Sequence, residues 1–188
     1  MSSQPHEVFY PYEQYVWLER SSNTKHEYLD GQIYAMGGGS PEHAALAAAI
    51  ITSLGNQLAG TKCRTYSSDL RIRTTSGLTT FPDVAVVCGV VEIDTTELQA
   101  VVNPTLLVEV LSPSTERFDK GAKFEHYRSI PTFNQYVLVS YRERSIEVRT
   151  REENVWNSVV IRDGEIADLS SIGAKLNVRE IYDSAGIT

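Results

Sequence analysis

Two carboxylates lie in apolar, strand-like segments at positions where an apolar residue is expected: Asp83 in FPDVAVV and Glu109 in LLVEVL. The second segment is apolar on both faces, which is typical of a strand buried within a sheet. Burying an unpaired carboxylate costs roughly several kcal/mol, so we expect Glu109 to be protonated, ion-paired or bound to a cation. Alternation along the first segment places Asp83 on the same face as Ala85 and Val87. If the two strands are neighbours, both carboxylates lie in one cleft.

Two carboxylates at such close range cannot both stay ionised without a cation between them. A hard divalent ion with oxygen ligands satisfies both, and Mg²⁺, which retains several waters, suits a phosphate substrate. We therefore expect Asp83 and Glu109 to bind Mg²⁺ or Mn²⁺. The alternative is a structural ion-pair network that satisfies the carboxylates without chemistry.

The segment TERFDKGAKFEHYRSI, which follows the Glu109 strand, has the pattern of an amphipathic helix. On a helical wheel Lys123 lies near the middle of the apolar half, close to Tyr127 and Ile130, whereas Lys120 lies nearer its edge. We expect the Lys123 ammonium to point toward the sheet, where a carboxylate can pair with it.

These residues resemble a known family. A PD pair, a spacer and a glutamate in an apolar strand resemble the PD-(D/E)XK nuclease superfamily, and the strings EVLSPST, DKGAK and FEHYRSIPTFNQYVLV resemble its Uma-two type of restriction endonucleases. The likeness extends to HEYLDGQIYAM and SSDLRIR and covers most of the chain. It implies an α/β fold with a restriction-endonuclease-like core, in which a central mixed sheet is flanked by helices. We expect residues 1–188 to form a single domain of this kind.

The resemblance implies metal-assisted hydrolysis of phosphodiester bonds in nucleic acid, with DNA as the expected substrate. Asp83 and Glu109 would be the metal ligands, and Glu27 would be a further acidic catalytic residue beside the metal. The superfamily's lysine usually stands two residues after the strand glutamate, where this chain has Leu111. Some members carry this lysine on the following helix, which makes Lys123 the matching catalytic residue. For Glu27, a solvent-facing position on a strand is the alternative.

A second function from another class is an inactive nuclease fold that serves as a homodimeric interaction or regulatory module. Leu111 at the usual lysine position and the formal net charge of −7 both favour this alternative. The nuclease hypothesis also predicts a homodimer, because two active sites are needed to cut both strands of a duplex. Motifs of serine hydrolases, zinc peptidases, CxxC proteins and dinucleotide-binding folds are absent from the sequence.

Residues 40–60 have the pattern of a helix that begins at Ser40, with Pro41 at its first position. His43 falls on the same face as Ile50 and Leu54, so we expect it on the cleft side of the helix. It is either a packed core or rim residue or part of the catalytic site. Upstream, HEYLDGQIYAM predicts two short strands that turn at Asp30-Gly31.

The acidic composition, with a pI near 5.1, argues against a protein that coats nucleic acid by bulk electrostatics. Six basic residues could still form a local phosphate-binding groove or a solvated surface: Lys62, Arg64, Arg71, Arg73, Arg142 and Arg144. Cys63 and Cys88 lie in strand-like segments and are predicted to be reduced core residues of a cytosolic protein. No apolar run approaches the ~18 residues of a membrane span, and the N-terminus has no leader pattern, so we expect a cytoplasmic protein.

Overall fold

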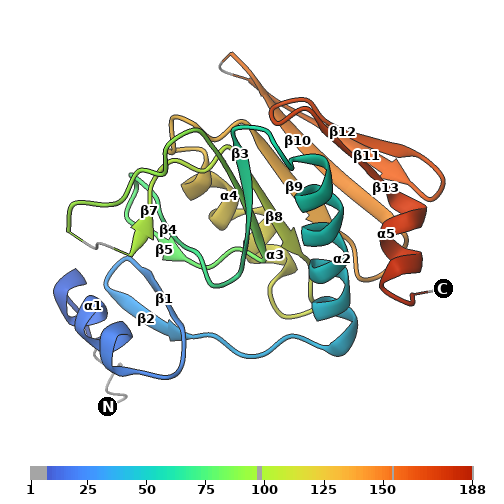
Figure 1. Ribbon diagram of the computed structural model, residues 1–188. Helices are drawn as coiled ribbons and strands as arrows, with labels where there is room; N and C mark the ends of the chain where they lie inside the picture. The colour runs from blue at the N-terminus through green and yellow to red at the C-terminus, as the bar shows by residue number, and fades with distance from the viewer. Residues whose placement is uncertain (1–7, 97–98, 154, 188) are drawn as a thin grey trace.

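The computed structural model describes residues 8–96, 99–153 and 155–187 (Figure 1). At its centre lies a six-stranded sheet in the order β11-β10-β9-β8-β6-β3. Its strands are β3 (Cys63–Ser67), β6 (Val84–Cys88), β8 (Leu106–Val110), β9 (Gln135–Val139), β10 (Ser145–Glu152) and β11 (Val155–Arg162). Strands β8 and β9 are parallel and the other neighbours are antiparallel, so the sheet is mixed, as predicted.

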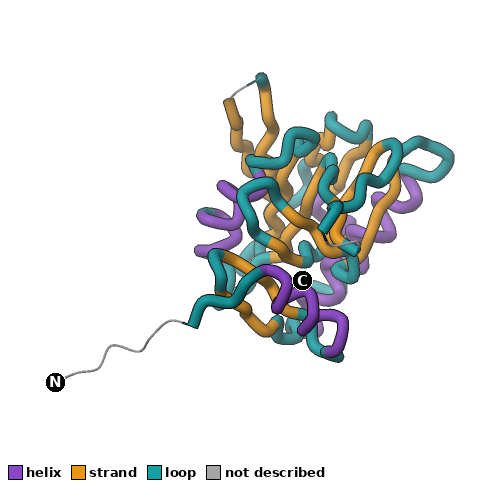
Figure 2. The backbone as a smooth tube through the Cα atoms, turned by 90° about the vertical axis from the view of Figure 1, so that its left-hand side faces the viewer, coloured by secondary structure: helices purple, strands orange, loops and turns teal. Residues whose placement is uncertain are grey.

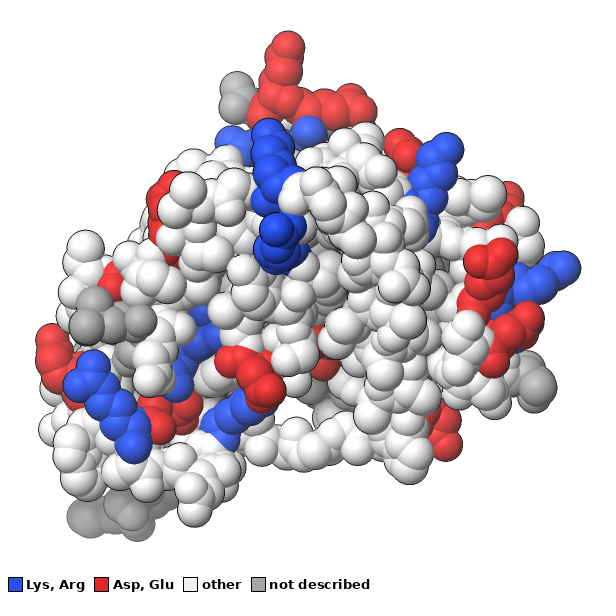
Figure 3. Space-filling view, in the orientation of Figure 1, with Lys and Arg blue, Asp and Glu red and all other residues white. Residues whose placement is uncertain are grey.

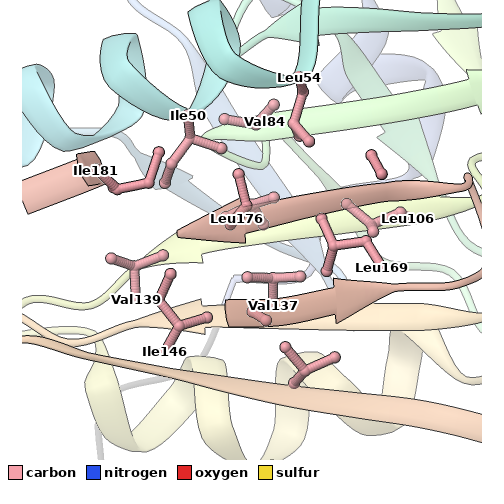
Figure 4. Packing of buried hydrophobic residues seen from close by; sticks show 14 of the residues in the cluster. Ile50, Leu54, Val84, Leu106, Val137, Val139, Ile146, Leu169, Leu176 and Ile181 are labelled. Carbon is pink, nitrogen blue, oxygen red and sulfur yellow. The ribbon is translucent and has the colours of Figure 1, made fainter. Parts of the chain in front are cut away.

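Helices cover both faces of this sheet. One face packs against α2 (Pro41–Gln57), α5 (Val178–Ser184) and a hairpin of β12 (Ile166–Leu169) and β13 (Ala174–Asn177). Figure 4 shows Ile50 and Leu54 of α2 pointing into a layer of Val84, Leu106, Val137 and Leu176. The prediction of a helix-flanked mixed sheet is confirmed. None of the described helices is long and apolar enough to cross a membrane.

The opposite face of the sheet is covered by the short helices α3 (Glu116–Lys120) and α4 (Ala122–Tyr127). Phe124 and Tyr127 of α4 pack there against Leu107 of β8 and Tyr136 of β9. Because side chains alternate along a strand, Glu109 shares this face with Leu107. The sheet therefore directs Glu109 toward the helices that follow it in the chain.

A smaller five-stranded sheet in the order β2-β1-β5-β4-β7 lies at the end of the molecule that carries α1 (Tyr12–Ser21). Its strands are β1 (His26–Leu29), β2 (Gln32–Ala35), β4 (Arg71–Arg73), β5 (Thr79–Thr80) and β7 (Ala100–Val101). In Figure 2, seen from this side, α1 lies against the β1-β2 hairpin, where Tyr15 packs on Tyr28. The hairpin turns at Asp30 and Gly31, both with positive φ, which confirms the predicted turn.

Cys63 and Cys88 are joined by a disulfide bond, so the prediction of two reduced cysteines is wrong. Strands β3 and β6 are antiparallel neighbours, and their register places the two cysteines directly opposite each other. Strand register depends on which strands pair, and the local pattern around each cysteine does not reveal it. The cysteines therefore give no support to a reducing compartment.

The helix predicted around Lys123 is broken into α3 and α4 at Gly121, whose φ of −113° and ψ of −102° are not helical. A Cβ at this position would lie 3.0 Å from the Arg117 carbonyl oxygen, so a glycine fits the break. The two helices still present Asp119, Lys123 and Tyr127 to the sheet, all of them buried.

Candidate active site

Asp83 and Glu109 lie on neighbouring strands. Strands β6 and β8 are antiparallel with Val84 opposite Val108, so one further step along both strands brings Asp83 opposite Glu109. The backbone N–H of Val110 donates to Asp83 Oδ2 at 2.7 Å. Both carboxylates line a cleft of about 320 Å³ at this end of the strands.

Lys123 of α4 reaches the same cleft from the helical layer. Its Nζ lies 2.9 Å from Glu109 Oε1, 3.3 Å from Glu27 Oε1 and 3.5 Å from Asp119 Oδ1. Burial alone would lower the pKa of the Lys123 ammonium, but Glu109, Glu27 and Asp119 outweigh it and hold that pKa well above its ordinary value. The structure thus places a fixed positive charge beside Glu109.

Glu27 comes from β1 of the smaller sheet and lies in the same cluster. Its Oε1 accepts a hydrogen bond from the Thr80 hydroxyl and faces the Lys123 ammonium. The alternative of a solvent-facing strand position is therefore wrong for Glu27. The smaller sheet contributes to the site by placing this carboxylate against the larger sheet.

The protonation of Glu109 is set by competing neighbours. The net effect raises its pKa to about 8: burial is the largest cause, the Lys123 ammonium opposes it, and the charges of Asp83 and Asp119 add to the increase. The Tyr127 hydroxyl donates to Glu109 Oε1 at 2.8 Å. Burial, followed by the charge of Glu109, raises the pKa of Tyr127 well above its ordinary value, so this hydroxyl stays a donor.

His43 approaches Asp83 from the other side of the cleft, on the first turn of α2. Its Nε2 lies 3.2 Å from Asp83 Oδ2, and its side chain is 22% exposed. The Ser40 hydroxyl caps the helix by accepting from the His43 backbone N–H, which agrees with the predicted helix start. His43 is thus a cleft residue in contact with Asp83.

Sequence reasoning assigned no role to two residues of this cluster, Asp119 and Tyr127. Asp119 is buried beside Lys123, and burial raises its pKa despite the nearby ammonium. Both residues stand four positions from Lys123, one on each side, which is the spacing that puts polar groups on one helical face. That spacing was the signal that could have found them.

Among the described residues that line this cleft, none of the six candidate basic residues is present. Arg71 pairs with Glu19 and Arg73 pairs with Asp94, each at 2.8 Å. Arg142 and Arg144 pair with acidic side chains too, and Arg64 donates to backbone carbonyls. On the face shown in Figure 3, the described basic and acidic side chains are interspersed. These contacts argue against a phosphate-binding groove for these arginines, and for Arg71 they also argue against a solvated surface, because it is buried in its pair with Glu19.

Within the described residues, no group of three or more His, Cys, Asp and Glu side chains is arranged to hold a metal ion. Lys123 lies among three of the carboxylates instead. The donor set of Asp83 and Glu109 nevertheless fits a hard divalent ion, because two carboxylates from adjacent strands leave further coordination positions for water and phosphate oxygens.

Comparison with known proteins places the chain among nuclease-type proteins. The family model Uma2, described as "Putative restriction endonuclease", matches residues 12–179. A protein of Synechocystis sp. strain PCC 6803, "Uncharacterized protein slr1290", is 38% identical over 172 residues, which are 90% of each chain. Another from the same organism, "Uncharacterized protein sll1609", is 32% identical over 67% of this chain and 72% of its own length.

A solved structure has a similar fold. It is described as "a putative nuclease belonging to DUF820" from Anabaena variabilis ATCC 29413, and it superposes with a TM-score of 0.71. The match covers 87% of this chain and 93% of the other at 14% sequence identity, so it bears on the fold alone. It agrees with the restriction-endonuclease-like arrangement of the sheet and helices.

Proposed function

Because the chain belongs to the Uma2 family of restriction-endonuclease-type proteins, we propose that it is a divalent-metal-dependent endonuclease that hydrolyses phosphodiester bonds, with DNA as substrate. One arrangement carries the proposal. Asp83 and Glu109 face a common cleft from adjacent strands, with the Lys123 ammonium 2.9 Å from Glu109. Metal-assisted phosphodiester hydrolysis can use such carboxylates as metal ligands and such an ammonium as a positive charge beside the phosphate.

Asp83 and Glu109 are the residues that would hold Mg²⁺ or Mn²⁺. When bound there, such an ion polarises the phosphate and makes a bound water more acidic. Lys123 offers a permanent charge and N–H donors for the water or for the negative charge that develops on the phosphate. Glu27 and Asp119 hold the ammonium in place from two further directions.

The test is cleavage of supercoiled plasmid by the purified protein in Mn²⁺ or Mg²⁺ at low salt. Wild type should cut, and Asp83→Asn should not. Lys123→Met keeps most of the apolar stem and removes the charge, so its rate should fall by roughly 10²-fold or more if Lys123 stabilises the transition state. The matched control is Lys120→Met, which removes a partly exposed lysine paired with Glu116 and should cut like wild type.

The outcome also decides between the enzyme and the inactive module. A folded wild-type protein that cuts neither duplex DNA, single-stranded DNA nor RNA would contradict the nuclease proposal and favour the module. If Lys123→Met cuts as fast as wild type, the role given to Lys123 is wrong, whereas the metal ligands are still tested by Asp83→Asn.

Homodimerisation is the second part of the proposal. Strand β11 lies at the edge of the six-stranded sheet and exposes Val155, Val159 and Val160. An edge with unpaired backbone groups and apolar side chains favours pairing with another chain, and two-fold dimers are the commonest soluble oligomers. Light scattering at micromolar concentration should give about twice the chain mass of 20.9 kDa, and a monomer mass would contradict it.

A further inference from the structure

His43 stands against the one carboxylate of the site that Lys123 does not contact. Its Nε2 is 3.2 Å from Asp83 Oδ2, and the Val110 N–H reaches the same oxygen at 2.7 Å from the opposite strand. Asp83 Oδ2 therefore receives donors from both α2 and β8. Asp83 lines the cleft, and we expect its other oxygen, Oδ1, to be the atom that binds a ligand there.

The fold fixes the His43 ring as well as its helix. The His43 backbone N–H is tied to the Ser40 hydroxyl at 3.2 Å, which anchors the first turn of α2. The ring lies over Gly39, where an added Cβ would be 2.7 Å from Nδ1 and 3.0 Å from Cγ. A glycine thus leaves room for the ring in the position where it meets Asp83.

From this geometry we propose that His43 is a positioning residue that orients Asp83 for the divalent ion. The inference rests on the proposed metal-dependent function and adds to it a role for a side chain outside the metal ligands. In this proposal His43 acts on the metal only through Asp83, because it contacts Oδ2 and leaves Oδ1 for the ion. Hydrogen-bond partners of ligating carboxylates typically change metal affinity by about 10–100-fold when they are removed.

The experiment measures Mn²⁺ binding by calorimetry to the metal-free wild-type protein and five variants. His43→Ala should weaken binding by about 10–100-fold. His43→Gln should retain wild-type affinity, because the glutamine Nε2 can donate to Asp83 from nearly the same place. Rescue by glutamine separates the hydrogen bond from a general packing effect, which both substitutions would disturb.

Two glycine variants test the same contact while the imidazole is kept. Gly39→Ala should push the ring away from Asp83 and weaken Mn²⁺ binding to a similar extent as His43→Ala. Gly38→Ala is the matched control in the same loop, since nothing lies within 4 Å of a Cβ there, and it should bind like wild type. The glycine pair keeps the proposal falsifiable if His43→Ala fails to fold.

Several results would overturn the proposal. Wild-type affinity in both His43→Ala and Gly39→Ala would show that the contact does not orient Asp83. Nitrogen hyperfine coupling in the electron spin-echo spectrum of bound Mn²⁺ would make His43 a direct ligand, which contradicts a role through Asp83. If Asp83→Asn abolishes binding and His43→Ala does not, only this inference fails. If wild type binds no Mn²⁺, the metal-dependent function and this inference fail together.

Discussion

The two carboxylates of the candidate site are held in opposite ways. The Glu109 side chain is 6% exposed and contacts the Lys123 ammonium and the Tyr127 hydroxyl. The Asp83 side chain is 18% exposed and contacts a backbone N–H and the His43 ring. One half of the site is a buried charge network that is complete without a ligand, and the other half opens to the cleft.

This difference predicts different consequences for stability and for binding. Removing one partner from a buried charged cluster is strongly destabilising, because the remaining charges are neither paired nor solvated by water. A partly exposed carboxylate keeps access to water, so its loss changes the fold little. We therefore expect the Glu109 half to control the stability of the metal-free protein and the Asp83 half to control its response to metal.

The largest expected effect is that of Lys123→Met on the free energy of unfolding. Removing the ammonium takes the shared cation from Glu27 and Asp119 and a hydrogen-bond donor from Glu109, and breaking a buried pair of this kind costs about 3–5 kcal/mol. Urea denaturation followed by circular dichroism measures it. Lys120→Met should lose well under ~1 kcal/mol, since surface ion pairs contribute little and Glu116 keeps its contact with Arg142. Equal losses in the two variants would contradict the view that Lys123 holds the buried half.

The second effect is the loss of stabilisation by Mn²⁺ in Asp83→Asn, which changes the half of the site that opens to the cleft. In metal-free buffer Asp83→Asn should unfold close to wild type, because the amide can still accept from the Val110 N–H. With Mn²⁺ at ~100 times its dissociation constant, wild type should gain roughly 2.7 kcal/mol and the variant should gain none. Thermal melts of both proteins with and without Mn²⁺ measure this gain in stability. A gain of the same size in the variant would place the metal away from Asp83.

The third effect is the pH dependence of stability that Glu109 contributes in the buried half. The pKa of Glu109 is about 8 in the fold against an ordinary value of 4.5, so between these values the folded state binds a proton that the unfolded chain has released. Wild-type stability should therefore fall with rising pH in this window relative to Glu109→Gln, which does not titrate. Between pH 6 and 7 the difference should change by about 1.4 kcal/mol.

Urea denaturation of both proteins in the presence of a chelator measures this difference. The comparison with the glutamine variant cancels the titration of groups whose pKa does not depend on the charge of Glu109. His43, whose pKa is raised chiefly by Asp83 and also by Glu109, titrates in both proteins. A difference between the two proteins that stays constant across this pH range would show that Glu109 is ionised throughout and that Lys123 alone satisfies it.

Much of the buried half follows from sequence periodicity. The 3.6-residue period directs Lys123 toward the sheet, and strand alternation puts Asp83 and Glu109 on faces that can meet. The structure agrees with both placements, although a break at Gly121 divides the expected helix. Periodicity succeeds here because each of these positions depends on only one local element.

Contacts between distant elements could not be predicted in this way. Glu27 reaches Lys123 because a second sheet packs on the first. His43 meets Asp83 because the first turn of α2 lies beside the start of β6. The bond between Cys63 and Cys88 depends on the register of two strands. Each of these contacts is decided by tertiary packing between segments that are far apart in the chain, which local patterns do not encode.

The smallest expected effect concerns Tyr127, and it sharpens the distinction between charge and hydrogen bonding within the buried half. Tyr127→Phe retains the ring, which packs against Phe133 and Tyr136, and removes only the donor at 2.8 Å from Glu109 Oε1. Because Lys123 still contacts that oxygen, the loss should be near 1 kcal/mol, the usual worth of one hydrogen bond. Tyr34→Phe removes an exposed hydroxyl and serves as the control, with no measurable change. If Tyr127→Phe is as damaging as Lys123→Met in urea denaturation, the tyrosine hydroxyl and not the ammonium is the main support of Glu109.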